Sequence, residues 1–543
     1  MPQSCSQSQG VSPSGASSTV LERKAITRAA GVVGFWTLLS RILGFIRDMV
    51  IARYMGAGLP ADAFFVAFRI PNLLRRLFAE GALSAAFIPT YVETLQHRGR
   101  SDALRLARLT FTAATLILLV VTVLGIFGGP WIVKVIAPGF SHDAAKFELT
   151  VRLTRIMFPY ILFISLVALA SGVLNSMNHF AAPAAAPTIL NICMIGAVFY
   201  AGTFTLPPWY ALAFGVTIAG FLQLALQSPF LANEGFRFRP CFDFRDPLLI
   251  RIGRLFVPAA VGGAVYQINV MIGTILASLL QPGGVSWLYY ADRLVELPLG
   301  IFAIALGTAV LPSMSRQAGN GDMEGLTQSV AYALRLIAFF TIPASVGLIM
   351  LREPVIATLF QRGKFTIVDT QQTAYALLWY TVGLWAFSGL KVVTQGFFSL
   401  KDTSTPVKVS VLAVVVNLVA GLALMGPMEQ GGLALATSVA SAVNLCILFC
   451  ALVRRLGRFP GREFIISLLK ISAASAVMSI PLIYGRSLGD WTTGANFNNL
   501  VILSGCVLGG LATFIAASYV LKCREAHALW ALLMQSVRKT GSS

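Results

Sequence analysis

The sequence predicts an all-α polytopic membrane protein with about 14 transmembrane helices, arranged as two pseudo-symmetric six-helix lobes followed by two C-terminal helices. Three observations support this fold class. The chain of 543 residues is 56% hydrophobic and only 12% charged, apolar runs of about 20 residues recur along its whole length, and short motifs repeat about 223 residues apart. This composition excludes a soluble globular protein.

The apolar runs define the expected spans. We place them at 29–52, 61–95, 104–127, 149–174, 184–202, 209–232, 249–280, 286–315, 328–350, 371–399, 405–425, 431–453, 463–484 and 498–521.

The basic residues are distributed unevenly between alternate loops. The two tails and every second loop carry 23 Lys and Arg, whereas the remaining loops carry 7. By the positive-inside rule the basic set is cytoplasmic, so both termini are expected in the cytoplasm. The net charge of +19 is thus explained by topology and contacts with anionic lipids, and no nucleic-acid partner is expected. Residues 1–28 and 522–543 are predicted as cytoplasmic tails, the first of them disordered.

An internal repeat divides the spans into lobes. Arg69 matches Arg293 at an offset of 224, Pro89 matches Pro312 at 223, and the segment 176–183 matches 399–406 at 223. One period contains six helices, so the two copies enter the membrane from the same side and are related by an axis along the membrane normal. We therefore expect a first lobe at 29–232, a second lobe at 249–453 and an added helix pair at 463–521.

Charged residues inside the first span are the first candidates for a site. Arg41, Arg47 and Asp48 lie in the run SRILGFIRD, where Arg41 and Asp48 share nearly one helix face. A bend at Gly44 would bring both arginines toward one cavity. An arginine at membrane depth costs at least a few kcal/mol and normally faces a water-filled interior, so such residues are read as functional.

The second segment, 61–95, is too long to cross the hydrocarbon core as one straight helix. Breaks are expected at Pro71, Gly81 and Pro89. The segment carries several charges, for which two interpretations remain open: a ligand site, or a ladder of ion pairs that holds the fold. These charged residues are Asp62, Arg69, Arg75, Arg76 and Glu80.

The equivalent segment of the second lobe places Asp292, Arg293 and Glu296 at helical spacings of three and four. Arginines outnumber acids in the first lobe, so the combined set favours an anionic ligand. A guanidinium binds phosphate or diphosphate in bidentate geometry, whereas a cavity for cationic drugs would carry net acid.

No enzyme signature is present: the sequence contains neither a P-loop nor an HExxH motif, and no cofactor or metal is expected. The membrane potential is the expected driving force, because an anion that moves outward across an inside-negative membrane gains about 2.3 kcal/mol per charge per 100 mV.

Several runs closely resemble the lipid II flippase MurJ (MviN) family of the multidrug, oligosaccharidyl-lipid and polysaccharide exporter superfamily. They are SRILGFIRD, GAGLPADAFFVAFRIPNLLRRLFAEGALSAAFIP, FPYI, SWLYYADRLVELPLG and LGTAVLP, and the similarity extends from about residue 29 to 525. The resemblance implies export of the undecaprenyl-diphosphate-linked peptidoglycan precursor, lipid II, from the cytoplasmic to the periplasmic leaflet of the bacterial inner membrane by alternating access, in cell wall synthesis.

By motif position the resemblance also implies the site. Arg41, Arg47, Arg75, Arg293 and Asp62 match the family's required residues. Three further positions, Asn72, Ser286 and Glu296, match positions associated with its cavity. Asp48, Arg69, Arg76, Glu80 and Asp292 are expected as supporting ion pairs, and the helices at 463–484 and 498–521 as a groove for the lipid tail. Some relatives in this family have a sodium site in the second lobe. Helices 249–280 and 405–425 here contain no Asp or Glu, so sodium coupling is not expected.

The expected partners are lipid II and membrane lipids, with transient contacts to cell wall synthesis proteins, and the chain is expected to act as a monomer. The alternatives are an exporter of another polyprenyl-diphosphate-linked oligosaccharide or of a drug within the same superfamily, and a membrane-bound transferase. The transferase would need carboxylates for metal binding in its loops, and the short loops here supply no obvious set.

Overall fold

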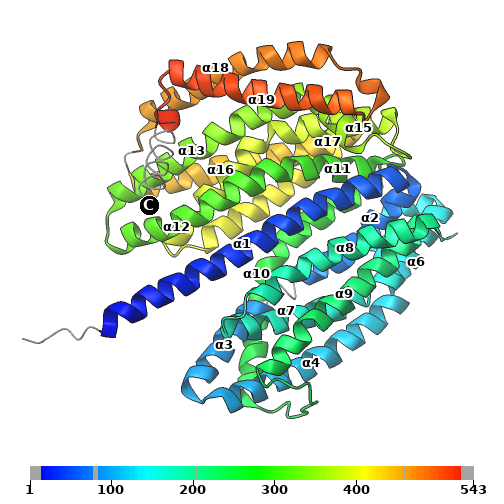
Figure 1. Cartoon of the computed structure of the whole chain (residues 1–543), viewed down its shortest axis with the longest axis vertical. Coiled ribbons are helices and arrows are strands. Elements are labelled where there is room, and N and C mark those ends of the chain that lie inside the picture. The colour runs from blue at the N-terminus through cyan, green and yellow to red at the C-terminus, as the bar shows by residue number, and fades with distance from the viewer. Residues whose placement is uncertain (1–13, 77–82, 204–205, 458, 528–543) are drawn as a thin grey trace, which may run out of the picture.

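Two helical bundles stand side by side, and the long helix α1 (Ser14–Met55) runs between them (Figure 1). The computed structural model describes residues 14–76, 83–203, 206–457 and 459–527, and all regular elements in these ranges are helices. The elements of the first bundle are α1 (Ser14–Met55), α2 (Leu59–Arg75), α3 (Ser84–His97), α4 (Arg100–Phe127), α5 (Gly129–Ile136), η2 (Pro138–His142), α6 (Ala144–Met157), α7 (Tyr160–Ser176), α8 (Ala181–Thr203) and α9 (Pro208–Asn233).

The second bundle begins with a long helix that contacts both halves, α10 (Pro247–Ser278). It continues with α11 (Gly284–Pro298), η3 (Leu299–Ala303), α12 (Ile304–Gly319), α13 (Met323–Met350), α14 (Arg352–Phe360), α15 (Ile367–Val382), α16 (Leu384–Ser399) and α17 (Ser404–Leu456). The last elements are α18 (Gly461–Ser487), η4 (Trp491–Thr493) and α19 (Phe497–Val520).

The helices are long and apolar enough to make this a multi-pass membrane protein. Within the described residues, 10 helices qualify as spans, or 11 if the bent pair α15 and α16 counts as one. The expected number of 14 stays a prediction. One reason for the difference is α17, whose 53 residues include a non-helical Glu429. At 1.5 Å per residue it is roughly 80 Å long, enough for the two spans expected at 405–425 and 431–453.

Two expectations for the first 100 residues were wrong. Helix α1 begins at Ser14, so residues 14–28 extend a helix instead of belonging to a disordered tail. Pro71 and Pro89 lie inside α2 and α3 and do not end them, since a membrane helix tolerates a proline where neighbouring groups satisfy the freed carbonyl. Helix α2 ends at Arg75 and α3 begins at Ser84. Glu80 and Gly81, between them, lie outside the described residues.

The internal repeat is visible in the backbone of two turns. Asn178 after α7 and Lys401 after α16 adopt left-handed φ values of 63° and 58°, and they are 223 residues apart. The amides one residue further along, of His179 and Asp402, donate to carbonyl oxygens five residues back at 2.9 and 3.0 Å. The two halves thus end equivalent helices with the same hydrogen-bonded turn.

Helix α10 does not belong to one bundle alone. Ile252 near its start is buried in a cluster with α3, α4 and α7 of the first bundle, whereas Leu276 near its end packs with residues of both bundles. The boundary drawn at residue 249 therefore separates the repeats in sequence but not in packing.

Helices α18 and α19 pack together against α13 on the outer side of the second bundle (Figure 1). Their shared core includes Phe339, Ile471 and Phe514. Arg335 of α13 adds a polar contact, since its Nε lies 3.5 Å from the buried carboxylate of Glu525. The function of this pair as a groove for a lipid tail stays a prediction.

Both ends of the described chain lie at one end of the bundles (Figure 1), which we call the proximal end. The distal end holds the turns at 56–58 and 361–366. There the Lys364 amide donates to the Arg53 carbonyl at 2.8 Å, and the Ala495 amide donates to the Gln361 carbonyl at 3.2 Å. These bonds join α1 and the final helix pair to the second bundle.

The turn before α17 supplies a test of the fold. Hydrogen bonds from Thr405 and Arg455 hold the pKa of the Asp402 carboxyl well below its usual range. A lowered folded-state pKa stabilises the fold above the unfolded value of about 3.9, and this contribution is lost as the pH falls below that value. We expect Asp402→Asn to lower the unfolding temperature of the purified protein at pH 7, and the difference from wild type to shrink as the pH falls below about 4. An equal difference at both pH values would contradict this account.

Candidate functional site

Equivalent positions of the two repeats meet where α2 faces α11. The carboxylate of Asp62 accepts a hydrogen bond from the Ser286 hydroxyl at 2.6 Å, and the rings of Phe65 and Tyr289 stack with centroids 3.9 Å apart. Both pairs are separated by 224 residues, the offset of the repeat. Residues that contact their own counterparts lie on a two-fold axis, so the pseudo-symmetry axis passes between α2 and α11.

Asp62 is fully buried and forms a latch between the halves of the molecule. Its Oδ1 accepts hydrogen bonds from the amide and hydroxyl of Ser286. Its Oδ2 accepts from the Gly283 amide and the Lys146 ammonium, each at 2.8 Å. Because the Gly283 amide immediately precedes α11 and the Ser286 amide lies in its first turn, the carboxylate also caps that helix at its positive end. In this conformation Asp62 and Ser286 hold the lobes together at the distal end.

One to two turns further along α11 lies a cluster of charges from both lobes. Arg47 is buried and donates from Nη2 to Asp48 Oδ1 at 2.7 Å and to the Tyr289 hydroxyl at 3.3 Å. Arg293 Nε lies 3.6 Å from Asp48 Oδ2, and its Nη1 donates to Glu296 at 2.6 Å. The Arg293 guanidinium also lies over the Tyr289 ring, 4.8 Å from the centroid. Asp48 thus pairs with an arginine of each lobe.

The exposed side of this cluster is formed by Arg293 and Glu296, whose side chains are 29% and 43% accessible. Asp48, in contrast, is 2% accessible. The inner acid is therefore fixed between its partners, whereas the outer pair can be reached by a ligand.

The remaining expected residues surround this cluster or lie next to α2. Arg69 donates to the Thr274 hydroxyl of α10 at 2.8 Å. Together with Arg76 and Arg293, it also interacts electrostatically with Asp292. The ion-pair interpretation of Arg69, Arg76 and Asp292 stays a prediction.

Arg41 and Arg75 are the two expected arginines that lie outside this cluster. Arg41 is exposed on α1, and its guanidinium lies so close to the backbone of Gly300 in η3 that a side chain at position 300 would collide with it. Arg75 is half-buried and donates from Nε to the Asn72 amide oxygen at 2.9 Å, which also places Asn72. Helix α1 continues through Gly44 without a break, and a bend there stays a prediction.

Sequence reasoning missed three residues of this region. Tyr289 lies one turn before Arg293 and connects both arginines with Asp48. Asn191 of α8 accepts from Arg47 Nη1 at 3.1 Å, and an amide within an apolar span is a signal that could have found it. Lys146 falls between the expected spans 104–127 and 149–174, which predicts a surface charge, yet it is 4% exposed and pairs with Asp62.

Two repeated helical bundles in a multi-pass membrane protein, with a charged cluster shared across their pseudo-two-fold axis, define a two-lobed membrane transporter. Residues 51–502 match the sequence pattern of the family described as "Lipid II flippase MurJ". The chain belongs to this family.

Individual relatives agree with this assignment. The chain is 37% identical to a "Probable lipid II flippase MurJ" of Vibrio cholerae, over 92% of this chain and 97% of that one. It is 35% identical to the "Lipid II flippase MurJ" of Burkholderia cenocepacia, over 92% of this chain and 98% of that one.

Solved structures show the same fold. A "Lipid II flippase MurJ, inward closed conformation" superimposes with a TM-score of 0.74 at 28% identity, covering 90% of this chain and 98% of the other. An inward-facing multidrug resistance transporter of the MATE family matches with a TM-score of 0.63 at 16% identity, covering 77% and 94%, which is a likeness of fold alone.

The latch supplies a test of how the lobes are held together. Asp62→Asn removes the charge that neutralises buried Lys146, and breaking one side of a buried ion pair costs about 3–5 kcal/mol. We expect a large fall in the unfolding temperature of the purified protein, partly restored in the double variant Asp62→Asn with Lys146→Met, because the unpaired cation is then removed as well. Asp143→Asn at the start of α6 serves as the control. No recovery in the double variant would show that the ion pair is not the source of the loss.

Proposed function

We propose that this protein flips lipid II, the undecaprenyl-diphosphate-linked peptidoglycan precursor, from the cytoplasmic to the periplasmic leaflet of the bacterial inner membrane. Family membership over most of the chain supports the substrate. The observation that carries the mechanism is the Arg47, Asp48, Tyr289 and Arg293 cluster, because each lobe contributes an arginine to one acid.

The diphosphate binds where the arginines gather. In the conformation described here the acceptors of Arg293 are carboxylates, and Glu296 is the more exposed of the two. An arriving diphosphate offers oxygens that suit the guanidinium fork better than a single carboxylate. The substrate therefore displaces Glu296 from Arg293, while Asp48 keeps the two arginines from repelling one another when the site is empty.

Arg41 and Arg75 receive the headgroup before it reaches the buried cluster. Arg41 is exposed on α1, the helix that lies between the bundles (Figure 1), and Arg75 lies at the end of α2. Both precede the cluster on the proximal side, which the positive-inside rule places in the cytoplasm. The lipid tail stays in the membrane while the headgroup crosses.

Alternation of access follows from the latch. The conformation described here is sealed at the distal end by Asp62 and its four donors, and outward opening requires these bonds to break. Rocking of the two lobes about the α2–α11 contact exposes the site first to one side and then to the other. Each lobe keeps its arginine, so the diphosphate loses part of its binding site when the lobes part.

The membrane potential drives the cycle in this proposal, since export of a diphosphate of about two charges gains about 2.3 kcal/mol per charge per 100 mV. Sodium coupling is not part of the proposal, because neither 249–280 nor 405–425 contains Asp or Glu. The protein acts as a monomer with both termini in the cytoplasm, and its contacts with cell wall synthesis proteins are transient.

The arginine cluster is tested by complementation. In a host depleted of the protein, Arg47→Ala and Arg293→Ala should each fail to restore lipid II at the outer leaflet, because each removes a charge-assisted donor worth about 1.5–3 kcal/mol. The measurement is the accessibility of lipid II to an external probe. Arg152→Ala, which removes an exposed arginine, is the matched control and should complement.

Two outcomes would count against the proposal in different ways. Normal translocation without the protein, in a host lacking any redundant exporter, would exclude flipping of lipid II by this chain. Full complementation by both arginine variants would leave transport in place but remove the diphosphate site.

The orientation has its own test. Single cysteines at Arg237 and Asp490, on a background without native cysteines, lie in loops assigned to opposite sides of the membrane. We expect a membrane-impermeant maleimide added to intact spheroplasts to label position 490 and spare position 237. The reverse pattern would invert the assignment.

A further inference from the structure

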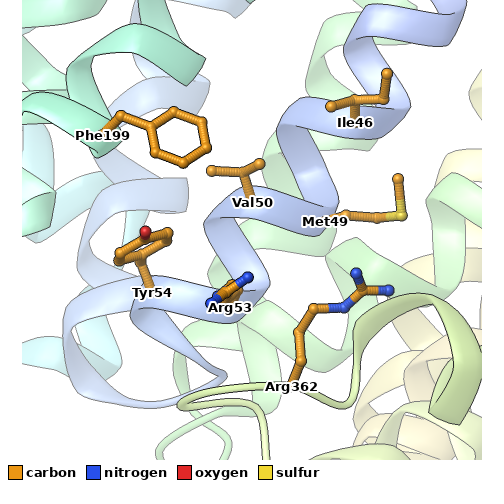
Figure 2. A pocket seen from close by; sticks show the side chains of 7 residues that line it. All are labelled: Ile46, Met49, Val50, Arg53, Tyr54, Phe199 and Arg362. Carbon is orange, nitrogen blue, oxygen red and sulfur yellow. The ribbon is translucent and has the colours of Figure 1, made fainter. Parts of the chain in front are cut away.

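A cavity of about 150 Å³ lies at the distal end, outside the charged cluster. Its lining comes from α1, α8 and the turn after α14, so both lobes contribute to it. The lining residues are Ile46, Met49, Val50, Arg53, Tyr54, Phe199 and Arg362 (Figure 2).

Two arginines face this cavity without an acid. Arg53 belongs to α1 and Arg362 to the turn between α14 and α15, and Figure 2 shows Arg362 extending from its turn toward α1 on the same side as Arg53. Within the described part of the chain, neither guanidinium lies within 4.0 Å of a carboxylate. Burial and the charge of Arg53 lower the pKa of Arg362, because a neighbouring cation and loss of solvent both disfavour the charged form.

Arg362 is held in position while part of it lacks a partner. Its Nη2 donates to the carbonyl oxygens of Thr358 and Leu359 at 2.9 and 2.8 Å. Its Nε is buried and has no hydrogen-bond partner. A buried N–H of a charged group without an acceptor costs free energy that an anion in the cavity would recover.

Apart from Tyr54, whose ring centroid lies 5.8 Å from the Arg53 guanidinium carbon, the other walls of the cavity are apolar and continue onto the exposed surface. Ile46 is 37% and Phe199 is 55% exposed, and Val50 and Met49 complete the apolar side. A hydrocarbon wall that leads to two unneutralised guanidinium groups matches an anionic lipid, whose phosphate and chain have the same arrangement.

We propose that this cavity binds the phosphate of an anionic membrane lipid, with the lipid chain along Ile46, Val50 and Phe199. The bound phosphate bridges Arg53 of the first lobe and Arg362 of the second. Both arginines are adjacent to the backbone bond between Lys364 and Arg53, so the two-sided site exists only while the distal end is closed. A ligand that binds one conformation shifts the population toward it, and the lipid therefore stabilises the closed form. This inference does not depend on which substrate is flipped.

The test uses the purified full-length protein in detergent. Dioleoyl phosphatidylglycerol is the probe, dioleoyl phosphatidylcholine supplies the same chains without net charge, and glycerol 3-phosphate supplies the anion without chains. Binding is measured by native mass spectrometry and by the rise in unfolding temperature. A spin-label pair at Trp131 and Val368, both exposed at the distal end, reports the lobe separation on a background without native cysteines.

We expect phosphatidylglycerol to bind, to raise the unfolding temperature and to shift the spin-label distances toward the shorter population. Arg53→Gln should weaken its binding on the order of tenfold, since one charge-assisted contact is lost. Arg362→Lys keeps the charge but loses the planar fork and should also bind more weakly. Lys134→Gln removes an exposed charge of the same end that does not line the cavity, and it should bind like wild type.

Three results would overturn the proposal. Unchanged phosphatidylglycerol binding in Arg53→Gln would remove the arginine pair from the site. Equal binding of phosphatidylcholine would remove the requirement for net negative charge. Equal binding of glycerol 3-phosphate would identify a site for a free phosphate ester instead of a lipid.

Discussion

A buried carboxylate on the pseudo-two-fold axis is the interaction on which this conformation depends. Asp62 of the first lobe receives four donors, two of them backbone amides at the start of α11 and one the ammonium of Lys146. All of its hydrogen-bonding capacity is used, so the charge is tolerated at zero exposure. Because every lone pair of the carboxylate is used, the contact forms or breaks nearly as a whole. Losing any one donor would leave a charge or an amide without a partner. Closure at the distal end is therefore a discrete state.

The charged cluster differs from this contact because one of its two acids is exposed. Asp48 is enclosed by Arg47, Tyr289 and Arg293, whereas Glu296 lies toward the open side. An inner acid that stays and an outer acid that can be exchanged allow the site to be stable when empty and still bind an anion. The lobes are thus joined by two contacts of unlike kind, one that must break for opening and one that the substrate itself completes.

Much of this organisation could be predicted from residues. The 223-residue offset located equivalent turns, and arginines in apolar runs located the cluster. The sequence did not identify Lys146 as a partner of Asp62, because a lysine near a span boundary resembles any surface charge until its helix is placed beside α2. The sequence also did not predict where α2 ends and α3 begins, because Pro71 and Pro89 are accommodated inside these helices by packing that the sequence does not show. The contact between Asp62 and Ser286 was within reach, because residues at the repeat offset face each other near the axis.

That contact also bears on how the two halves came to differ. In an ancestor with identical repeats, every position on the axis would meet a copy of itself, so an aspartate there would face an aspartate. Two adjacent buried carboxylates repel, and a pair of serines carries no charge to bind the ammonium of Lys146. The latch requires an acid on one side and a hydroxyl on the other. It is therefore a product of divergence after duplication, and neither lobe could form it with a second copy of itself.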